Sequence, residues 1–305
     1  MEEVVRHTTP STLTSESGGY VRSAPRSLMS DAFRSFRKRK SAMAGLVLVI
    51  IFCLASLVGL FYTPDDPYRA HLAQRLQAPS ARHIMGTDGF GRDVLSRILK
   101  GANLALAVGV VSVAIASVFG CLTGLIAGYF RGWIGALLMR VTDFLLAFPL
   151  ILLALTMIAT LGPGLGKVML AVGIATMPRF ARMMQSETLS VSKREFITAA
   201  RAVGATKWRI VLRHVLPNSL SSVLVMATLY VSTAILTEAS LSYLGLGPAP
   251  PTPTWGTMIN DASSVLRTAP WVAFFPALAI TIAVLGFSLA GDGLRDAFDT
   301  KLRDR

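Results

Sequence analysis

Long apolar runs with few or no charged residues are the feature that most constrains this chain. A helix needs about 20 mostly apolar residues to cross the roughly 30 Å of bilayer hydrocarbon. Six stretches can be interpreted as such helices: about 43–62, 104–130, 137–161, 168–177, 220–244 and 271–289. The stretch at 168–177 is the weakest, because it offers only about ten apolar residues before Pro178. The sequence therefore predicts an all-α membrane protein with six transmembrane helices.

Composition agrees with this fold class and excludes two others. Of the 305 residues, 52% are hydrophobic and 15% are charged, whereas soluble domains carry about 25% charged residues. The apolar runs leave too little polar sequence for two soluble domains. The net charge of +13 would also suit a nucleic-acid-binding protein. The basic residues, however, lie between and beside the apolar runs, so we expect no nucleic-acid partner.

The distribution of basic residues predicts which loops face the cytoplasm. Of the 30 Lys and Arg residues, 22 lie in 1–42, 131–140, 178–218 and 295–305. The alternate loops hold the other eight. Cytoplasmic loops carry an excess of Lys and Arg, so both termini are expected in the cytoplasm. Removing the weak fourth span would place the basic 178–218 segment outside, and that span is therefore kept.

The chain divides into a tail, a helical core and a second short tail. Residues 1–27 are rich in Ser and Thr, which predicts a disordered cytoplasmic tail. Residues 28–42 combine an apolar face with a basic cluster, which predicts an interfacial helix on the inner leaflet. A plain charged stop at the membrane edge is the alternative. The further divisions are a first transmembrane helix at 43–62, an outer segment at 63–103, a core of five transmembrane helices at 104–294 with an inner loop at 179–218, and a cytoplasmic tail at 295–305.

Motifs of covalent chemistry are missing. The stretch 162–167 is the nearest to a phosphate-binding loop, but it lacks the first glycine and is followed by Val168 where a hydroxyl is needed. Cys53 and Cys121 lie inside apolar runs, and the four histidines show no metal-ligand spacing. We therefore expect no catalytic residue, no metal site and no cofactor in this chain. A membrane enzyme is a distant alternative.

Four residues inside the predicted spans are candidates for a role there. Glu238 is the ionisable residue that lies well inside a span. Such residues are expensive to bury, so Glu238 is a candidate to line or gate a pathway. A satisfied structural carboxylate near the interface is the alternative. Gly120, Gly124 and Gly128 clear one face of the second span and predict close helix packing.

The long inner loop has the pattern helix–Gly–helix–Pro. Residues 195–203 form a short helical pattern, and Gly204 is placed to end it. A second pattern starts at Trp208 and is expected to stop at Pro217. Small residues at the centre of the first helix would allow it to enter a partner's cleft. The spacing alone leaves two interpretations open: a docking surface, or an amphipathic loop without a partner.

A family resemblance favours the docking surface. Thr198-Ala199-Ala200, Gly204 and Leu216-Pro217 keep the spacing of the Glu-Ala-Ala loop of ABC importer permeases, with Thr198 in place of glutamate and His214 in place of isoleucine. Residues 83–97, 243–258 and 291–301 are similar to other signatures of the same subfamily. The sequence resembles the second permease of the dipeptide, oligopeptide, glutathione, opine and nickel importers.

This resemblance implies partners and a mechanism. A homologous second permease would form the other half of the translocation path in the bacterial inner membrane. Two cytoplasmic ATPases, which carry the ATP and magnesium, would receive the loop helix at Thr198, Ala199, Ala200 and Gly204, with Leu216 and Pro217 at its base. A periplasmic or lipid-anchored binding protein would deliver the solute. Peptides are favoured as solutes over nickel, glutathione or opines. An ion-coupled secondary transporter or channel is the alternative from another class.

Overall fold

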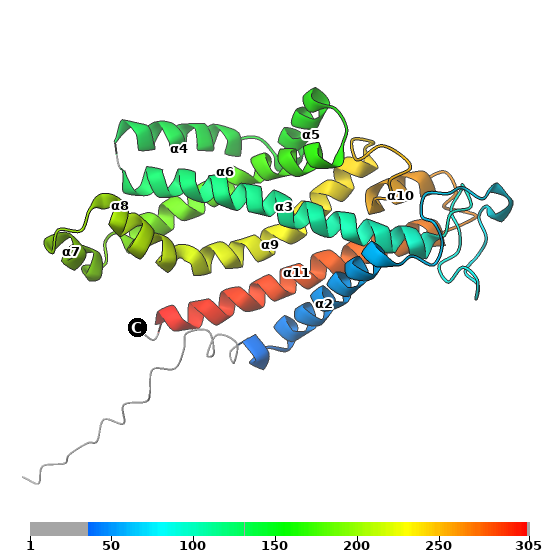
Figure 1. Cartoon of the computed structure of the whole chain (residues 1–305), viewed down its shortest axis with the longest axis horizontal. Coiled ribbons are helices and arrows are strands. Elements are labelled where there is room, and N and C mark those ends of the chain that lie inside the picture. Colours follow the sequence, from blue (N-terminus) through cyan, green and yellow to red (C-terminus); the bar gives the residue numbers. More distant parts are fainter. Residues whose placement is uncertain (1–35, 131, 304–305) are drawn as a thin grey trace, which may run out of the picture.

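The computed structural model describes residues 36–130 and 132–303, and most of them lie in helices (Figure 1). In this part of the chain no strand forms, and only an isolated bridge joins Thr87 to Asp93. The predicted tail at 1–27 and most of the predicted interfacial helix at 28–42 lie outside the described residues. The helices are α2 (Lys40–Phe61), η1 (Leu72–Gln74), α3 (Val94–Tyr129), α4 (Trp133–Leu146), α5 (Leu150–Leu161), α6 (Leu165–Val191), α7 (Glu195–Ala202), α8 (Lys207–Ile210), η2 (Val211–Val215), α9 (Leu216–Tyr243), α10 (Trp255–Ala262) and α11 (Trp271–Arg303).

Helix α3 is the centre of the packing. It lies along α6 and also contacts α2 and α9, while α11 packs against α2 and α9. Helices α7 and α8 and the C-terminal part of α11 lie toward one end of the molecule, which we call the loop end (Figure 1). Helix α10 and residues 62–93 lie at the opposite end, which we call the pocket end (Figure 1). The core therefore separates two regions of different structure.

Several helices have the length and composition of membrane spans. Among the described residues, α2, α3, α11 and the helical stretch Lys207–Tyr243 are long and apolar enough to cross a membrane. The α4–α5 pair adds a fifth candidate if it counts as one bent span. The all-helical membrane fold is thus confirmed, whereas six spans and cytoplasmic termini stay predictions.

The predicted third span is broken rather than continuous. Helices α4 and α5 meet at an angle of 93°, and Pro149 stands directly before the first residue of α5. Proline lacks the N–H that would continue the helix, and its ring disfavours a helical residue before it. A single continuous helix over 137–161 is therefore wrong.

The predicted fourth span is longer than its apolar stretch. Helix α6 continues through Pro178 and ends at Val191, so the expected end at Met177 is wrong. The reason lies in the partner helix. A Cβ added to Gly120 would lie 2.6 Å from the Phe180 Cβ, and one added to Gly124 would overlap the carbonyl oxygen of Ala181. Close packing of α3 on both sides of Pro178 offsets the ~3 kcal/mol that an interior proline costs a helix.

The expected helix stop at Pro217 is also wrong. Pro217 lies in the first turn of α9, which continues directly from the π-helical turn η2. The N–H of Leu216 donates to the carbonyl oxygen of Val211, five residues back. This wider turn accommodates a residue that has no N–H to donate. The inner loop therefore passes without a break into α9.

Two other helices extend beyond their predicted spans. Helix α3 begins at Val94, inside the predicted outer segment, because Asp93 caps its first turn by accepting from the N–H of Ser96. Helix α11 continues to Arg303, through most of the predicted tail at 295–305. Near that end Arg39 forms an ion pair with Asp296.

Candidate functional site

The first candidate site is α7, the short helix at the loop end. Ile197 is buried and fixes one face of the helix to the core. Thr198 and Ala199 are exposed on the outer face, and Ala200 is half-buried. Val203, which follows the helix, is 85% exposed. The helix thus presents small and apolar side chains to its surroundings.

Helix α7 ends at Ala202, and Gly204 follows the capping residue Val203 at the position where the sequence predicts the helix stop. Gly204 has φ +79°, a left-handed conformation that an L-residue with a side chain disfavours. Its N–H donates to the carbonyl oxygen of Arg201, and the N–H of Ala205 donates to that of Ala200, both at 3.0 Å. These two bonds satisfy carbonyls that the helix end would leave open. The turn after α7 therefore has a defined shape.

Aromatic contacts attach the loop to the end of α3. The rings of Phe130 and Trp208 lie 4.9 Å apart, and the Arg201 guanidinium lies 6.0 Å from the ring centre of Tyr129. Leu216 is half-buried and Pro217 is exposed at the start of α9. The residues of the resemblance are therefore divided between α7 and the base of α9.

Glu238 lies in the C-terminal half of α9, toward the pocket end. Its side chain is buried, and the hydroxyl of Ser242 donates to its carboxylate over 2.6 Å. This contact supports the interpretation as a satisfied structural carboxylate. Ser242 itself lines the pocket described below, so Glu238 lies one helical turn from that pocket.

The three glycines that were expected to allow close helix packing lie on the face of α3 that contacts α6. Gly120, Gly124 and Gly128 all face α6, and a Cβ on Gly128 would lie 2.8 Å from the Thr188 Cβ. Contacts this short leave no room for a side chain without a shift of one helix.

At the pocket end, a network of buried polar groups holds residues 83–97. The Asp88 carboxylate accepts from the N–H groups of Phe90 and Arg92 and from Nε of Arg92, at 2.7–3.0 Å. Asp93 accepts from the N–H and the hydroxyl of Ser96, both at 2.8 Å. The Gly-Thr-Asp-x-x-Gly-Arg-Asp signature therefore forms a compact loop, stabilised by hydrogen bonds that its two aspartates accept.

Three residues of this end have the composition of a metal-ligand set. His83 Nδ1 lies 3.1 Å from Asp93 Oδ1 and 3.6 Å from Asp65 Oδ2. A histidine and two carboxylates are ligands that zinc accepts, although a plain histidine–carboxylate hydrogen bond accounts for the shorter contact equally well. The sequence analysis missed this grouping, because the fold rather than the spacing brings Asp65 to His83. The expectation that the chain binds no metal stays a prediction.

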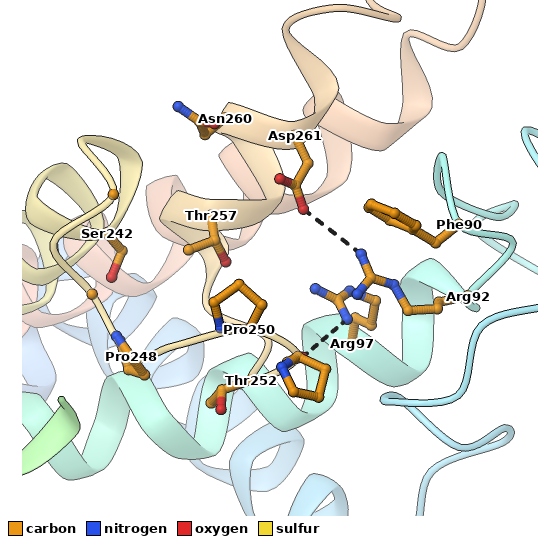
Figure 2. A pocket seen from close by; sticks show the side chains of 13 residues that line it. Phe90, Arg92, Arg97, Ser242, Pro248, Pro250, Thr252, Thr257, Asn260 and Asp261 are labelled. Atoms are coloured by element: carbon orange, nitrogen blue, oxygen red, sulfur yellow. Dashed lines mark hydrogen bonds and ion pairs between the residues drawn. The ribbon is translucent and has the colours of Figure 1, made fainter. Parts of the chain in front are cut away.

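The second candidate site is a pocket of about 400 Å³ between the start of α3, the loop after α9 and α10 (Figure 2). Arg97 is 2% exposed, and its NH1 donates to the carbonyl oxygen of Pro67 over 2.9 Å. NH2 of Arg92 lies 3.7 Å from the Asp261 carboxylate. The lining residues are Phe90, Arg92, Arg97, Ser242, Gly245, Gly247, Pro248, Pro250, Pro251, Thr252, Thr257, Asn260 and Asp261.

Asp261 is the acid of this pocket and lies in α10. Partial burial raises the pKa of its carboxyl above the ordinary value, and the guanidinium groups of Arg92 and Arg97 oppose that rise. Sequence reasoning gave no role to these three residues. The signal that could have found the two arginines is the charge density at 88–97, where two acids and two arginines precede an apolar run. No such signal marks Asp261.

Fold and sites together define a class: a helical membrane protein with an exposed loop helix at one end and a polar pocket at the other. Comparison with known proteins places the chain more closely. The family model described as binding-protein-dependent transport system inner membrane component matches residues 120–304. The model for the N-terminal TM domain of oligopeptide transport permease C matches residues 27–79. The chain belongs to this family and is an ABC importer permease subunit.

Named relatives agree with that assignment. The dipeptide transport system permease protein DppC of Alkalihalophilus pseudofirmus is 44% identical over 273 residues, which are 90% of either chain. The glutathione transport system permease protein GsiD of Pectobacterium atrosepticum is 43% identical over 272 residues, covering 89% of this chain and 90% of the relative. A chain of the inward-facing MetNI methionine ABC transporter superposes with a TM-score of 0.55 and 24% identity, over 66% of this chain and 95% of that one. The structural likeness shows a shared fold.

Proposed function

We propose that this permease carries small peptides inward across the bacterial inner membrane, as one half of a path shared with a homologous second permease. In this proposal the loop end faces the cytoplasm and the pocket end faces the periplasm. The charge distribution supports that orientation, because the four loops expected inside hold 22 of the 30 basic residues. Helix α6, which lies along α3, completes a set of six spans.

Coupling to ATP hydrolysis is assigned to α7. The observation that carries this step is the exposed face with Ala199 and Val203 on a helix whose other face is fixed by Ile197. A rigid, small-sided helix can enter a cleft of a cytoplasmic ATPase and transmit movement to α9, with which its loop is continuous. Two such ATPases carry the ATP and magnesium, and this chain hydrolyses nothing. Thr198 offers a hydroxyl where the motif has a carboxylate, so its contact with the ATPase is uncharged.

The solute class follows from the relatives. Proteins named for dipeptide and for glutathione transport are about equally identical to this chain. Both solutes are small peptides with charged ends, and this shared chemistry is what we assign. A binding protein in the periplasm or on a lipid anchor delivers the peptide. Nickel and opines are the lower-ranked alternatives.

Reconstitution tests this function. The chain would be purified with its co-purifying subunits and placed in proteoliposomes that contain ATP in the lumen. The binding protein and labelled dialanine or glutathione would be added outside the vesicles. We expect uptake that needs both the binding protein and hydrolysable ATP. Uptake without ATP, driven by an ion gradient, would instead support the secondary transporter.

A further inference from the structure

The pocket at the pocket end combines both signs of charge in a small rigid space. Its floor is the polar network of 83–97, and its opposite wall is α10 (Figure 2). Prolines 248, 250 and 251 stiffen the loop between α9 and α10. A volume of about 400 Å³ lies within the range of small-molecule sites. The pocket is therefore sized for a small solute.

The two arginines differ in how their charge is compensated. Arg92 is paired with Asp88, its Nε lying 2.7 Å from the carboxylate. Arg97 receives no comparably short pairing: its NH1 donates to the carbonyl oxygen of Pro67 over 2.9 Å and to that of Pro251 over 3.5 Å (Figure 2). Its Nε is 3.5 Å from the same Asp88 and makes no hydrogen bond. A carbonyl dipole cannot neutralise a buried cation. Arg97 is therefore the positive pole of the pocket.

Asp261 supplies the negative pole. Its side chain is 45% exposed, and its contact with NH2 of Arg92 is long at 3.7 Å. Arg92 is already bound to Asp88, so Asp261 is available to a second cation. The charged residues that line the pocket are two arginines and Asp261. Asp88, which is not a lining residue, pairs with Arg92 and balances the remaining positive charge. Such a site complements a solute that carries a carboxylate and an ammonium group at its two ends.

We propose that this pocket binds a zwitterionic small peptide, with its carboxylate at Arg97 and its ammonium group at Asp261. The inference rests on the proposed function and deepens it by naming the site and the chemistry that recognises the solute. Phe90 and the prolines contact the apolar parts of the peptide. Asn260 also lines the pocket; its Nδ2 donates to the carbonyl oxygen of Tyr243, and its Oδ1 can accept from the peptide N–H.

The test measures selectivity rather than affinity alone. The complex of this chain with its partner subunits, in nanodiscs without binding protein, is titrated with dialanine, its C-terminal amide and its N-acetyl form. For the wild type we expect each blocked form to bind about tenfold more weakly, the size of one lost charge-assisted hydrogen bond. Arg97→Gln should abolish the preference for the free carboxylate and keep that for the free amine. Asp261→Asn should do the reverse.

Matched controls separate this role from folding. Arg69→Gln and Asp66→Asn change exposed residues of the same end and should keep both preferences. Asp261 is half-exposed, so Asp261→Asn gives a result even if Arg97→Gln does not fold. Equal binding of all three peptides by the wild type, or unchanged preferences in Asp261→Asn, would overturn the inference. If the pocket inference fails in this way but the wild type still takes up dialanine in an ATP-dependent manner, peptide import is supported and only the assignment of this pocket as the binding site is wrong.

Discussion

The two ends of the molecule differ in where their side chains find partners. At the pocket end, charged groups such as Asp88 and Arg97 are buried and bonded to neighbours in residues 62–97, and Arg97 also donates to the carbonyl oxygen of Pro251. At the loop end, large apolar side chains such as Val203 and Trp208 are 85% and 58% exposed. The pocket end thus completes its own structure. The loop end has a defined shape and leaves an apolar surface exposed, as protein or membrane contact sites do.

This comparison predicts that mutations at the two ends fail in different ways. Changes at the pocket end should lower the stability of the permease itself. Changes at the loop end should leave the permease folded and break its connection with the ATPases.

The largest effect is expected from Asp88→Ala. This substitution leaves Arg92 buried without the carboxylate that pairs with it and removes the acid nearest to Arg97. Breaking a buried ion pair costs about 3–5 kcal/mol. We expect a strong fall in the amount of folded protein and in its unfolding temperature in detergent, measured by fluorescence-detected size exclusion and thermal scanning. Asp66→Ala, at an exposed acid of the same segment, is the control. Equal stability of both variants would show that the network does not hold this end.

Ala199→Asp should have the next largest effect. A charge on the exposed face of α7 would be buried in the ATPase cleft without a partner. Transport should fall at least about tenfold, the equivalent of ~1.4 kcal/mol, while the unfolding temperature of the permease stays at the wild-type value. Ala199→Ser, which keeps the small size, should retain transport. A matching loss of stability would remove the distinction between the two ends.

Gly204→Ala should give a smaller loss. The left-handed conformation of Gly204 costs a residue with a Cβ about 1–2 kcal/mol. The turn after α7 would loosen, and transport should fall several-fold. Gly204→Asn is the control, because asparagine tolerates this conformation better. Transport that is lower in the asparagine variant than in the alanine variant would argue against the conformational explanation.

Phe130→Leu is expected to have the smallest effect. It removes a ring pair with Trp208 that is worth about 0.5–1.5 kcal/mol beyond its burial. We expect peptide-stimulated ATPase activity to fall about twofold with unchanged basal activity. Phe119→Leu, at an exposed site in α3, the helix that Phe130 follows, should change neither rate. An equal decrease in both variants would show that the contact with Trp208 does not attach the loop.

Much of the helical core could be predicted from the sequence, because long apolar segments must face either lipid or the protein interior. The start of α3 could not, since its first turns are polar and depend on Asp93 and on the fold of 83–97. Both misplaced ends, at Pro178 and Pro217, share one cause. Local rules end a helix at proline, but close packing of α3 against α6 and the π turn before α9 override them.

The loop helix was predictable because its information is local: small residues, then a glycine at the helix end. The pocket was not, because Arg97 and Asp261 are distant in sequence and meet only when α10 folds over α3. Glu238 was found by its charge alone, and its partner Ser242 lies four residues on. That i,i+4 spacing could have indicated the pairing from the sequence.

Coupling of this permease to ATPases through α7 can be tested by purifying the tagged chain from detergent-solubilised membranes. Quantitative mass spectrometry would then identify the proteins that accompany it. We expect the wild type to recover a second permease and two ATPases, and Ala199→Asp to recover the second permease with the ATPases largely lost. This is the result that coupling through α7 requires. Full recovery of the ATPases with Ala199→Asp, or a wild-type chain that purifies alone and transports peptide without ATP, would contradict it.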